Sequence, residues 1–345
     1  MSKILLFIFF GATLSLVSLS YEMKNNFLLD EVNVEELPVE LVLSNISGEV
    51  YKHAISKLDM EKAELGKQLI TKGKAKSKSH KGKLISKYYT CTDCHNLVKE
   101  TEIPTDLNPH ARLAYAQKNN LPFLPASTFW GIYNRTTFFN QDYVKRFGDK
   151  IKNAKDSLTN AIQVCAKYSS SGRFLEGWEV EAILHYFKKN ELKIKDLNLG
   201  VKVEKNILYW QKLDQTEKTL LKVILQANYI QSYPATFVPT ITIDQRKYGE
   251  GANAIDGEII FSRACLHCHA GKRVSGINLE KSSLTANLFW KNIEDYSSSN
   301  LYQLVRWGTY TKSHKKKYMP HYTKEKMSDE QIEDLVAYIK KISKK

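Results

Sequence analysis

The amino-acid sequence predicts an all-α protein built from two helical domains in tandem. Apolar residues recur at helical spacing in several segments, and the alternation typical of half-buried strands is nearly absent. Residues Val180–Lys189 align without a gap onto Ile332–Lys341, with Tyr186 opposite Tyr338, so the chain repeats part of itself. A length of 345 residues suits two domains of ordinary size.

We expect a leader, an extension, two domains and a connecting segment. These are a signal peptide over residues 1–20, an extension over 21–50, a first domain over 51–200, a connecting helix and linker over 201–245, and a second domain over 246–345. Helices are expected at residues 51–70, 180–189, 214–230, 255–261 and 332–341. Pro234 and Pro239 predict that residues 233–244 form an extended linker.

Two pentapeptides of the pattern Cys-x-x-Cys-His point to the chemistry. They are Cys91–His95 and Cys265–His269. The pattern is the attachment signature of c-type haem, in which both thiols form thioethers with the porphyrin and the adjacent histidine ligates the iron. The alternative is a four-cysteine zinc site. Zinc ribbons place their two cysteine pairs a few tens of residues apart, however, whereas these pairs begin 174 residues apart.

The sequence therefore predicts two covalently bound haem c groups, one in each half of the chain. The expected attachment thiols are Cys91, Cys94, Cys265 and Cys268, and the expected proximal iron ligands are His95 and His269. The fifth cysteine, Cys165, is left without a partner for a disulfide and needs another explanation.

The N-terminus predicts export. An apolar run over residues 4–19 follows Lys3, and small residues precede a cleavage position at Tyr21. The run is short for a membrane span, so we expect a cleaved signal peptide and a periplasmic protein. The alternative is an uncleaved membrane anchor. Export agrees with the motifs, because c-type haem is attached on the outer side of the energised membrane.

The formal net charge is +14, and part of it lies in a lysine-rich stretch over residues 72–83. Behind a signal peptide, such a charge argues against nucleic acid as the partner. It favours an acidic protein partner or an anionic substrate. The lysine-rich stretch itself is expected to be a solvated loop.

The second half offers methionine as the sixth iron ligand. Met319 stands ahead of the closing helix, and its thioether would favour ferrous iron and raise the potential. Met327 is the alternative, but it occupies the start of that helix, where a packing or surface role is expected. Lysines crowd the loop before Met319, so we expect an acidic redox protein to dock at the edge of the second haem. They are Lys312, Lys315, Lys316 and Lys317.

The first half has no methionine after its motif and needs a different sixth ligand. The candidates are His110, Cys165, His185 and the lysines. Cys165 precedes the repeat tyrosine of its half by 21 residues, and Met319 precedes its own by 19. Residues 158, 162 and 165 share one helical face, which turns the thiol inward. A packed thiol fits this pattern too, but the register favours Cys165 as the ligand. His185 is expected to be structural, and His110 is the remaining candidate.

Residues 250–345 resemble a class I cytochrome c domain. The resemblance rests on Gly257-x-x-Ile260-Phe261, the second Cys-x-x-Cys-His motif, Met319-Pro320 and the terminal helix over residues 334–339. It implies a helical fold around one covalent haem and a role in electron transfer. With the repeat, it leads us to expect two cytochrome c-like domains, each around one haem.

The first half is similar to the cytochrome c domain of thiosulfate dehydrogenases and of the diheme subunit of the Sox sulfur-oxidising complex. The similar residues are Gly66-x-x-Leu69-Ile70-Thr71, the first motif, Ala161-Ile162-x-x-Cys165, Gly172-Arg173-x-Leu175 and the helix over residues 179–186. In those families the cysteine ligates the active-site haem and contacts the sulfur substrate, which implies this role for Cys165. Arg135 or Arg173 would then hold the anion. Family members often carry Arg-Ser where this chain has Lys167-Tyr168-Ser169.

Three functions compete. The first is an exported diheme cytochrome that passes single electrons through a His/Cys haem and a His/Met haem. The second is an oxidoreductase that oxidises thiosulfate or another sulfur anion at the Cys165 haem and delivers electrons to a cytochrome acceptor. In both, a thiolate would lower the potential of the first haem, so that electrons run from the first haem to the second. The third, a diheme peroxidase, needs acid and base residues beside an open iron position, and no distinct pattern indicates them.

Overall fold

The computed structural model describes residues 33–77, 79–271, 274–280, 282–294, 300–309 and 318–343. The all-α prediction is confirmed, because within these residues the β contacts are two isolated bridges, Pro38 with Lys193 and Thr137 with Ser232. The predicted signal peptide and the lysines at 312–317 lie outside the described residues. Among the described residues, no helix combines the length and the apolar character that crossing a membrane requires.

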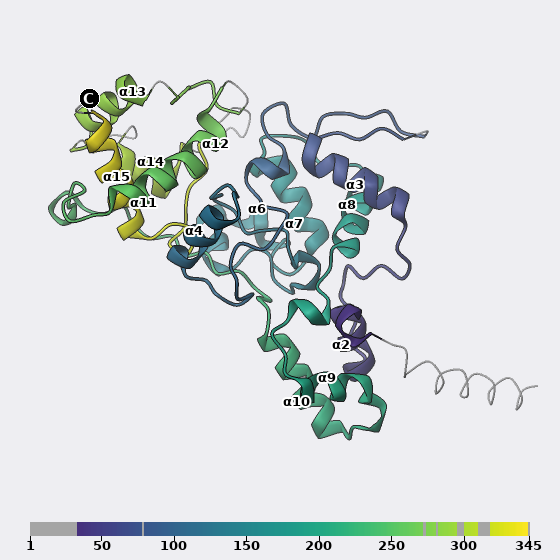
Figure 1. Ribbon diagram of the computed structural model, residues 1–345. Helices are drawn as coiled ribbons and strands as arrows, with labels where there is room; N and C mark the ends of the chain where they lie inside the picture. Colours follow the sequence, from purple (N-terminus) through teal and green to yellow (C-terminus); the bar gives the residue numbers. More distant parts are fainter. Residues whose placement is uncertain are drawn as a thin grey trace, which may run out of the picture. The chain divides into compact units, whose positions relative to one another are not determined.

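The helices follow one another in a simple order (Figure 1). The α-helices are α2 (Val39–Ser47), α3 (Met60–Lys72), α4 (Pro109–Lys118), α5 (Gln141–Phe147), α6 (Asp149–Lys152), α7 (Leu158–Val164), α8 (Gly177–Lys189), α9 (Val201–Leu208), α10 (Gln215–Ala227), α11 (Ala254–Ile260), α12 (Leu266–His269), α13 (Ser282–Lys291), α14 (Leu301–Trp307) and α15 (Asp329–Ser343). The short turns are η1 (Val34–Glu36), η2 (Cys91–Asp93), η3 (Ile132–Asn134), η4 (Cys165–Ser169), η5 (Ile194–Asp196), η6 (Trp210–Lys212), η7 (Ile243–Gln245) and η8 (Phe261–Cys265), of which η4 and η8 are π-helical.

The described chain divides into two compact units. One contains the residues up to Glu49 together with Lys193–Leu225, and the other contains Val50–Leu192 together with Gln226–Lys345. Both Cys-x-x-Cys-His motifs belong to the larger unit. Within it, we call residues 50–192 the first half and residues 226–345 the second half.

The smaller unit joins part of the predicted extension to the predicted connecting helix. Helix α10 confirms the helix expected at residues 214–230, and α2 lies within the extension. Glu36 forms ion pairs with Lys193, at 2.5 Å, and with Lys195. These pairs and the buried side chains of α2, α9 and α10 hold the two chain segments of this unit together.

Each half of the larger unit is framed by two crossing helices (Figure 1). Helix α3 packs against α8 in the first half, and α11 packs against α15 in the second. Glycine makes both crossings close: a Cβ atom on Gly66 would overlap the carbonyl oxygen of Ala182, and one on Gly257 would overlap that of Asp334. In the predicted repeat, Ala182 aligns with Asp334. The structure therefore reproduces the predicted alignment atom for atom at its tightest point.

One predicted helix is shorter than expected. The sequence pattern predicts a helix from residue 51, but α3 begins at Met60. The Asp59 side chain accepts the backbone N–H of Lys62, which caps the helix there. The residues before Asp59 instead pack locally, with the His53 ring stacked 5.4 Å from the ring of Tyr51. Apolar spacing alone did not reveal this boundary.

The hydrophobic core of the second half includes residues from the first. Leu113 and Ala116 of α4, with Phe123 just after it, belong to the same buried cluster as Ile260 and Val336. The Tyr322 hydroxyl donates to the Phe123 carbonyl oxygen at 2.9 Å. The two halves therefore share apolar surface, and Phe123 holds the chain around residue 322 in place.

The glycine at the second crossing gives a direct test of this frame. We expect Gly257→Ala to lower the free energy of unfolding by about 1–3 kcal/mol, because the new methyl group forces α11 away from the backbone of α15. Gly177→Ala is the matched control, because a Cβ there meets no atom within 4 Å. Thermal unfolding of both variants measures the effect. Equal stability of Gly257→Ala and the wild type would contradict the close crossing.

Candidate functional site

The first motif opens onto a cavity in the first half. The cavity is lined by Cys91, Cys94, His95 and Cys165, together with mostly apolar and aromatic side chains from α3, α7 and α8. Residues 158, 162 and 165 all line it, which confirms that they share an inward face. An apolar cavity with two thiols and an imidazole on its wall fits a covalently attached haem. The structure thus brings together the four residues predicted for this site, the three of the first motif and Cys165.

The turn that carries the first motif is stabilised by its own residues. The backbone N–H of Thr90 donates to the Asp93 carboxylate at 2.7 Å, and Asp93 is buried. This bond closes the 3-10 turn η2, which presents Cys91 and Cys94 to the cavity. The middle residues of the motif therefore hold the loop in shape, while the thiols and His95 face inward.

Both motif histidines are oriented in the same way. The Nδ1–H of His95 donates to the Ser127 carbonyl oxygen at 2.6 Å, and the Nδ1–H of His269 donates to the Ile277 carbonyl oxygen at 3.0 Å. A carbonyl oxygen can only accept, so each Nδ1 carries a proton, and Nε2 is the ring nitrogen left to ligate a metal. A carbonyl partner of this kind is the usual support of a metal-ligating histidine. Burial also lowers the pKa of His95 to about 4, so its ring stays neutral.

Cys165 begins a π-helical turn at the end of α7. The backbone N–H of Ser170 donates to the Cys165 carbonyl oxygen at 2.8 Å, five residues along the chain, which widens the helix at this point. Burial raises the pKa of the Cys165 thiol to about 11, although a hydrogen bond with Ser169 opposes the rise. Without a metal, the group is therefore a neutral thiol. Coordination to iron would remove its proton.

A second π-helical turn carries the second motif. Helix α11 continues into η8, whose last residue is Cys265, and the short helix α12 then holds Cys268 and His269. Burial raises the pKa of Cys265 to about 12. Single π turns inside helices are frequent at functional sites. The two π turns lie at Cys165 and at Cys265, both of them predicted site residues.

The two motifs lie close to each other. Burial, followed by the charge of Cys268, raises the pKa of Cys94. Asp93 and His95 of the first motif line one hollow with His267 of the second. The structure therefore places the two attachment sequences side by side, although they are far apart in the chain.

Met319 lies in a segment held from both sides. Its N–H donates to the Thr309 hydroxyl at 2.7 Å, and its carbonyl oxygen accepts the Thr309 N–H at 3.0 Å. The preceding residue, Tyr318, bonds instead to Tyr89, through both its N–H and its carbonyl oxygen. Backbone groups that point alternately to opposite sides belong to an extended chain, in which neighbouring side chains face opposite ways. Tyr318 lines the first cavity, so Met319 faces away from it.

The alternative ligands take part in other contacts. Met327 is buried in the core of the second half, with 1 % of its surface exposed. The Ser328 hydroxyl lies 3.2 Å from Nε2 of His110. Nδ1 of His185 accepts the Asp59 N–H at 3.2 Å. None of these three side chains is among the residues that line the first cavity.

The two predicted anion-binding arginines have different surroundings. Arg173 forms a bidentate ion pair with the buried Glu179, at 2.7 and 2.6 Å, and also donates to backbone carbonyl oxygens at the base of the lysine-rich loop. Its role in the structure is therefore to fasten that loop. Arg135 lines the cavity and is 4 % exposed. It donates to the Thr128 and Trp130 carbonyl oxygens, and burial lowers its pKa to about 10.

Several cavity residues were not singled out by the sequence analysis, although Lys150 belongs to the lysines that it offered as candidate ligands. Lys150 and Tyr143 reach the cavity from the α5–α6 region, and Tyr318, Pro320 and His321 reach it from the second half. Burial lowers the pKa of His321 to about 3 and raises that of Tyr143 to about 12. They lie far from the first motif in the chain, so the sequence did not place them at this cavity. The position of Tyr318 and His321 around the predicted ligand Met319 was the one available clue.

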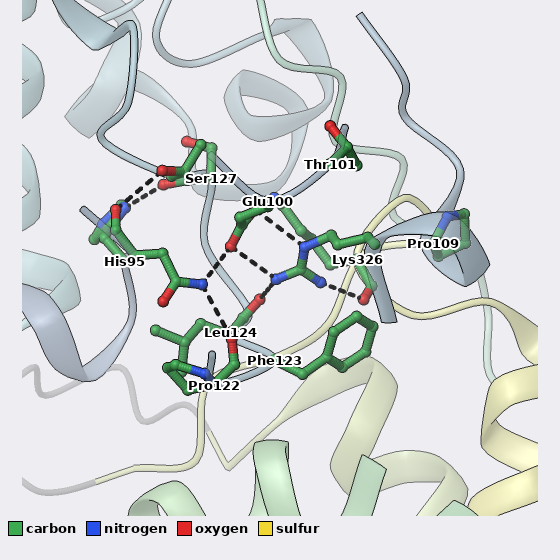
Figure 2. A network of polar contacts seen from close by, with 12 residues as sticks. His95, Glu100, Thr101, Pro109, Pro122, Phe123, Leu124, Ser127 and Lys326 are labelled. Atoms are coloured by element: carbon green, nitrogen blue, oxygen red, sulfur yellow. Dashed lines mark hydrogen bonds and ion pairs between the residues drawn. The ribbon is translucent and has the colours of Figure 1, made fainter. Parts of the chain in front are cut away.

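A buried group of charges joins the two halves beside His95 (Figure 2). Glu100 accepts from Arg112 at 3.0 Å and from Lys326 at 3.1 Å, and all three side chains are at most 6 % exposed. Although burial by itself raises the pKa of Glu100, the charges of Arg112 and Lys326 lower it to about 2. Burial lowers the pKa of Lys326 to about 8. Asn96, next to His95, donates to the same carboxylate at 2.7 Å.

Comparison with known proteins identifies part of the chain. Residues 252–339 match the family model described as cytochrome c oxidase, cbb3-type, subunit III. No curated protein and no solved structure matched the chain. The match confirms the predicted class I cytochrome c domain at the C-terminus, and it contains Cys265, Cys268, His269 and Met319.

This domain implies covalently bound haem c and supports electron transfer by a haem protein. The residues of the second motif fit that group, because both thiols and a carbonyl-supported imidazole are present. The similarity of the first half to thiosulfate dehydrogenases and the Sox subunit stays a prediction.

The buried charges allow a test of the joint between the halves. Glu100→Gln should lower the free energy of unfolding by about 3–5 kcal/mol, because Arg112 and Lys326 then remain buried without their counter-ion. Glu102→Gln is the control, since Glu102 pairs with Lys118 on the exposed surface and its loss should change little. Denaturant unfolding of both variants measures the difference. A mild effect of Glu100→Gln, equal to that of the control, would mean that water reaches this group.

Proposed function

We propose that the chain is an exported diheme c-type cytochrome that transfers electrons through two differently ligated haems. The first would be attached at Cys91 and Cys94, with His95 and Cys165 as iron ligands. The second would be attached at Cys265 and Cys268, with His269 and Met319 as iron ligands. Covalent haem supplies a one-electron couple, and the protein sets its potential through the ligands.

The observation that carries this proposal is the shared support of the two motif histidines. Each donates Nδ1–H to a backbone carbonyl oxygen and keeps Nε2 for a metal. The second histidine lies in the matched cytochrome c domain. The first repeats the same arrangement beside an apolar cavity that also contains Cys165. The same chemistry at both motifs is the simplest explanation of the repeated geometry.

The two sites would have unlike potentials. A thiolate is anionic and stabilises ferric iron, whereas a thioether favours ferrous iron. Electrons would therefore run from the first haem to the second. The closeness of the motifs supports this direct route, since Asp93 and His95 of the first line one hollow with His267 of the second.

A second function, oxidation of a sulfur anion at Cys165, has one observation in its favour. Arg135 and Lys150 both line the cavity, so an anionic group inside it would be stabilised by positive charge. Arg135 donates to the Ser127 hydroxyl and to backbone carbonyl oxygens and lies over the Tyr233 ring, and these neutral partners leave its charge available to an anion. That anion would be a carboxylate of the haem or a substrate such as thiosulfate.

The partner and the compartment follow from the sequence. We infer an acidic redox protein at the edge of the second haem, drawn by the lysines before Met319, and a periplasmic location after cleavage of the signal peptide. If the signal is retained, the same domains would face the same compartment from a membrane anchor.

Cys165→Gly tests the ligand of the first haem. The oxidised wild type should show a thiolate-type low-spin signal in electron paramagnetic resonance, and the variant should lose it while its mass still includes two haems. Ala166→Gly is the control, because it loosens the same turn and keeps the thiol. If thiosulfate reduces the haems of the wild type and not those of the variant, the result supports the sulfur-oxidising function. A first-haem signal that survives in Cys165→Gly would return the thiol to a packing role.

Met319→Ala tests the second haem. Loss of the thioether removes its preference for ferrous iron, so the midpoint potential of the second haem should fall by on the order of 100 mV or more. Met60→Ala provides the control, because Met60 is an exposed methionine on α3, with 55 % of its surface accessible. Spectroelectrochemical titration measures both haems. An unchanged potential in Met319→Ala would show that another residue ligates this iron.

A further inference from the structure

A single tyrosine lies between the two proposed sixth ligands. Tyr318 lines the first cavity with its side chain, while Met319, its neighbour in the chain, faces away from that cavity. The Tyr318 hydroxyl donates to the Ser169 carbonyl oxygen at 2.5 Å. Ser169 ends the π turn that begins at Cys165. The Tyr318 side chain therefore contacts the turn that carries Cys165, and Met319 follows Tyr318 in the chain.

Tyr89 fixes this tyrosine from the first half. Its hydroxyl donates to the Tyr318 carbonyl oxygen at 2.6 Å and accepts the Tyr318 N–H at 2.7 Å. The two rings also meet at 5.8 Å between centroids. Tyr89 is 7 % exposed and stands two residues before Cys91, so the rigid turn of the first motif anchors it.

The opposite edge of the segment is held within the second half. Thr309 makes both backbone bonds to Met319, and a Cβ on Gly308 would overlap the Met319 carbonyl oxygen, so this edge is tightly packed. The position of Met319 thus depends on two supports. One is internal to the cytochrome c domain, and the other is Tyr89 of the first half.

We propose that Tyr89 and Tyr318 form a positioning pair that makes the two sixth ligands, Cys165 and Met319, depend on each other. This inference rests on the proposed function, because it assumes that both residues bind iron. It adds a prediction that neither site makes alone: a substitution next to the first motif changes ligation at the second haem.

Tyr89→Phe in the full-length protein tests the first link. Removing one hydroxyl deletes both hydrogen bonds between Tyr89 and the Tyr318 backbone, which should weaken Met319 binding about tenfold. The readouts are the midpoint potential of the second haem, which should fall, and imidazole titration of its iron, which should show about tenfold tighter binding. Tyr186→Phe is the control, because Tyr186 also belongs to the first half but neither lines the cavity nor contacts this segment.

Tyr318→Phe tests the second link, between Tyr318 and the turn that carries Cys165. It also keeps the proposal testable if the Tyr89→Phe protein does not fold or bind haem. It keeps the backbone bonds to Tyr89 and removes the hydroxyl that donates to Ser169. The thiolate signal of the first haem should therefore shift or broaden, while the potential of the second haem stays near the wild-type value. A wild-type first-haem signal in this variant would overturn the link to Cys165.

The Cys165→Gly and Met319→Ala variants separate the possible failures. If Met319→Ala alters the second haem and Tyr89→Phe leaves both its potential and its imidazole affinity unchanged, the coupling is overturned and the proposed ligands stand. If Met319→Ala leaves the second haem unchanged, the ligand assignment fails and the coupling fails with it. A tenfold rise in the imidazole affinity of the second haem in Tyr89→Phe, absent from Tyr186→Phe, supports the coupling.

Discussion

The close crossing of the first and last helices of each half is the constraint on which the rest of the structure depends. At Gly66 and at Gly257 the backbone of one helix meets the backbone of the other, and no larger residue fits between them. In the second half the crossing helix continues into the π turn that ends at Cys265. In the first, α8 and α3 together wall the cavity onto which Cys91 opens. The frame thus fixes where the attachment thiols can lie.

The second determinant is the joint between the halves, which makes them more than two independent domains. The buried carboxylate of Glu100 holds two cations, one from each half, and α4 contributes Leu113 to the core of the other half. Removing such charges from water is costly, and they persist because each is paired and hydrogen-bonded. The joint holds the chain at Lys326 against the first half, and Tyr89 of the first half holds Tyr318 beside Met319, so one half helps to build the other's candidate site.

If the chain carries the two proposed haems, this arrangement would give electron transfer a direction. A site with a thiolate and a site with a thioether differ in potential, and a fixed joint keeps their separation constant. The contacts of Tyr318 with the Cys165 turn and with Tyr89 would let a change at one iron reach the other. Electron transfer by a haem protein is supported by the matched cytochrome c domain.

The sequence by itself determined what depends on local pattern: the helical class, the repeat, the two Cys-x-x-Cys-His motifs and the inward face of Cys165. These follow from residue spacing, which a helix converts directly into geometry. It missed the start of α3, where the cap at Asp59 outweighs apolar spacing. Only the tertiary structure decided that Ser127 supports His95, that α4 packs in the other half, and that Tyr89 holds Tyr318. These contacts join residues far apart in the chain, and a hydrogen bond to a backbone carbonyl requires no particular side chain, so it leaves no trace in the sequence.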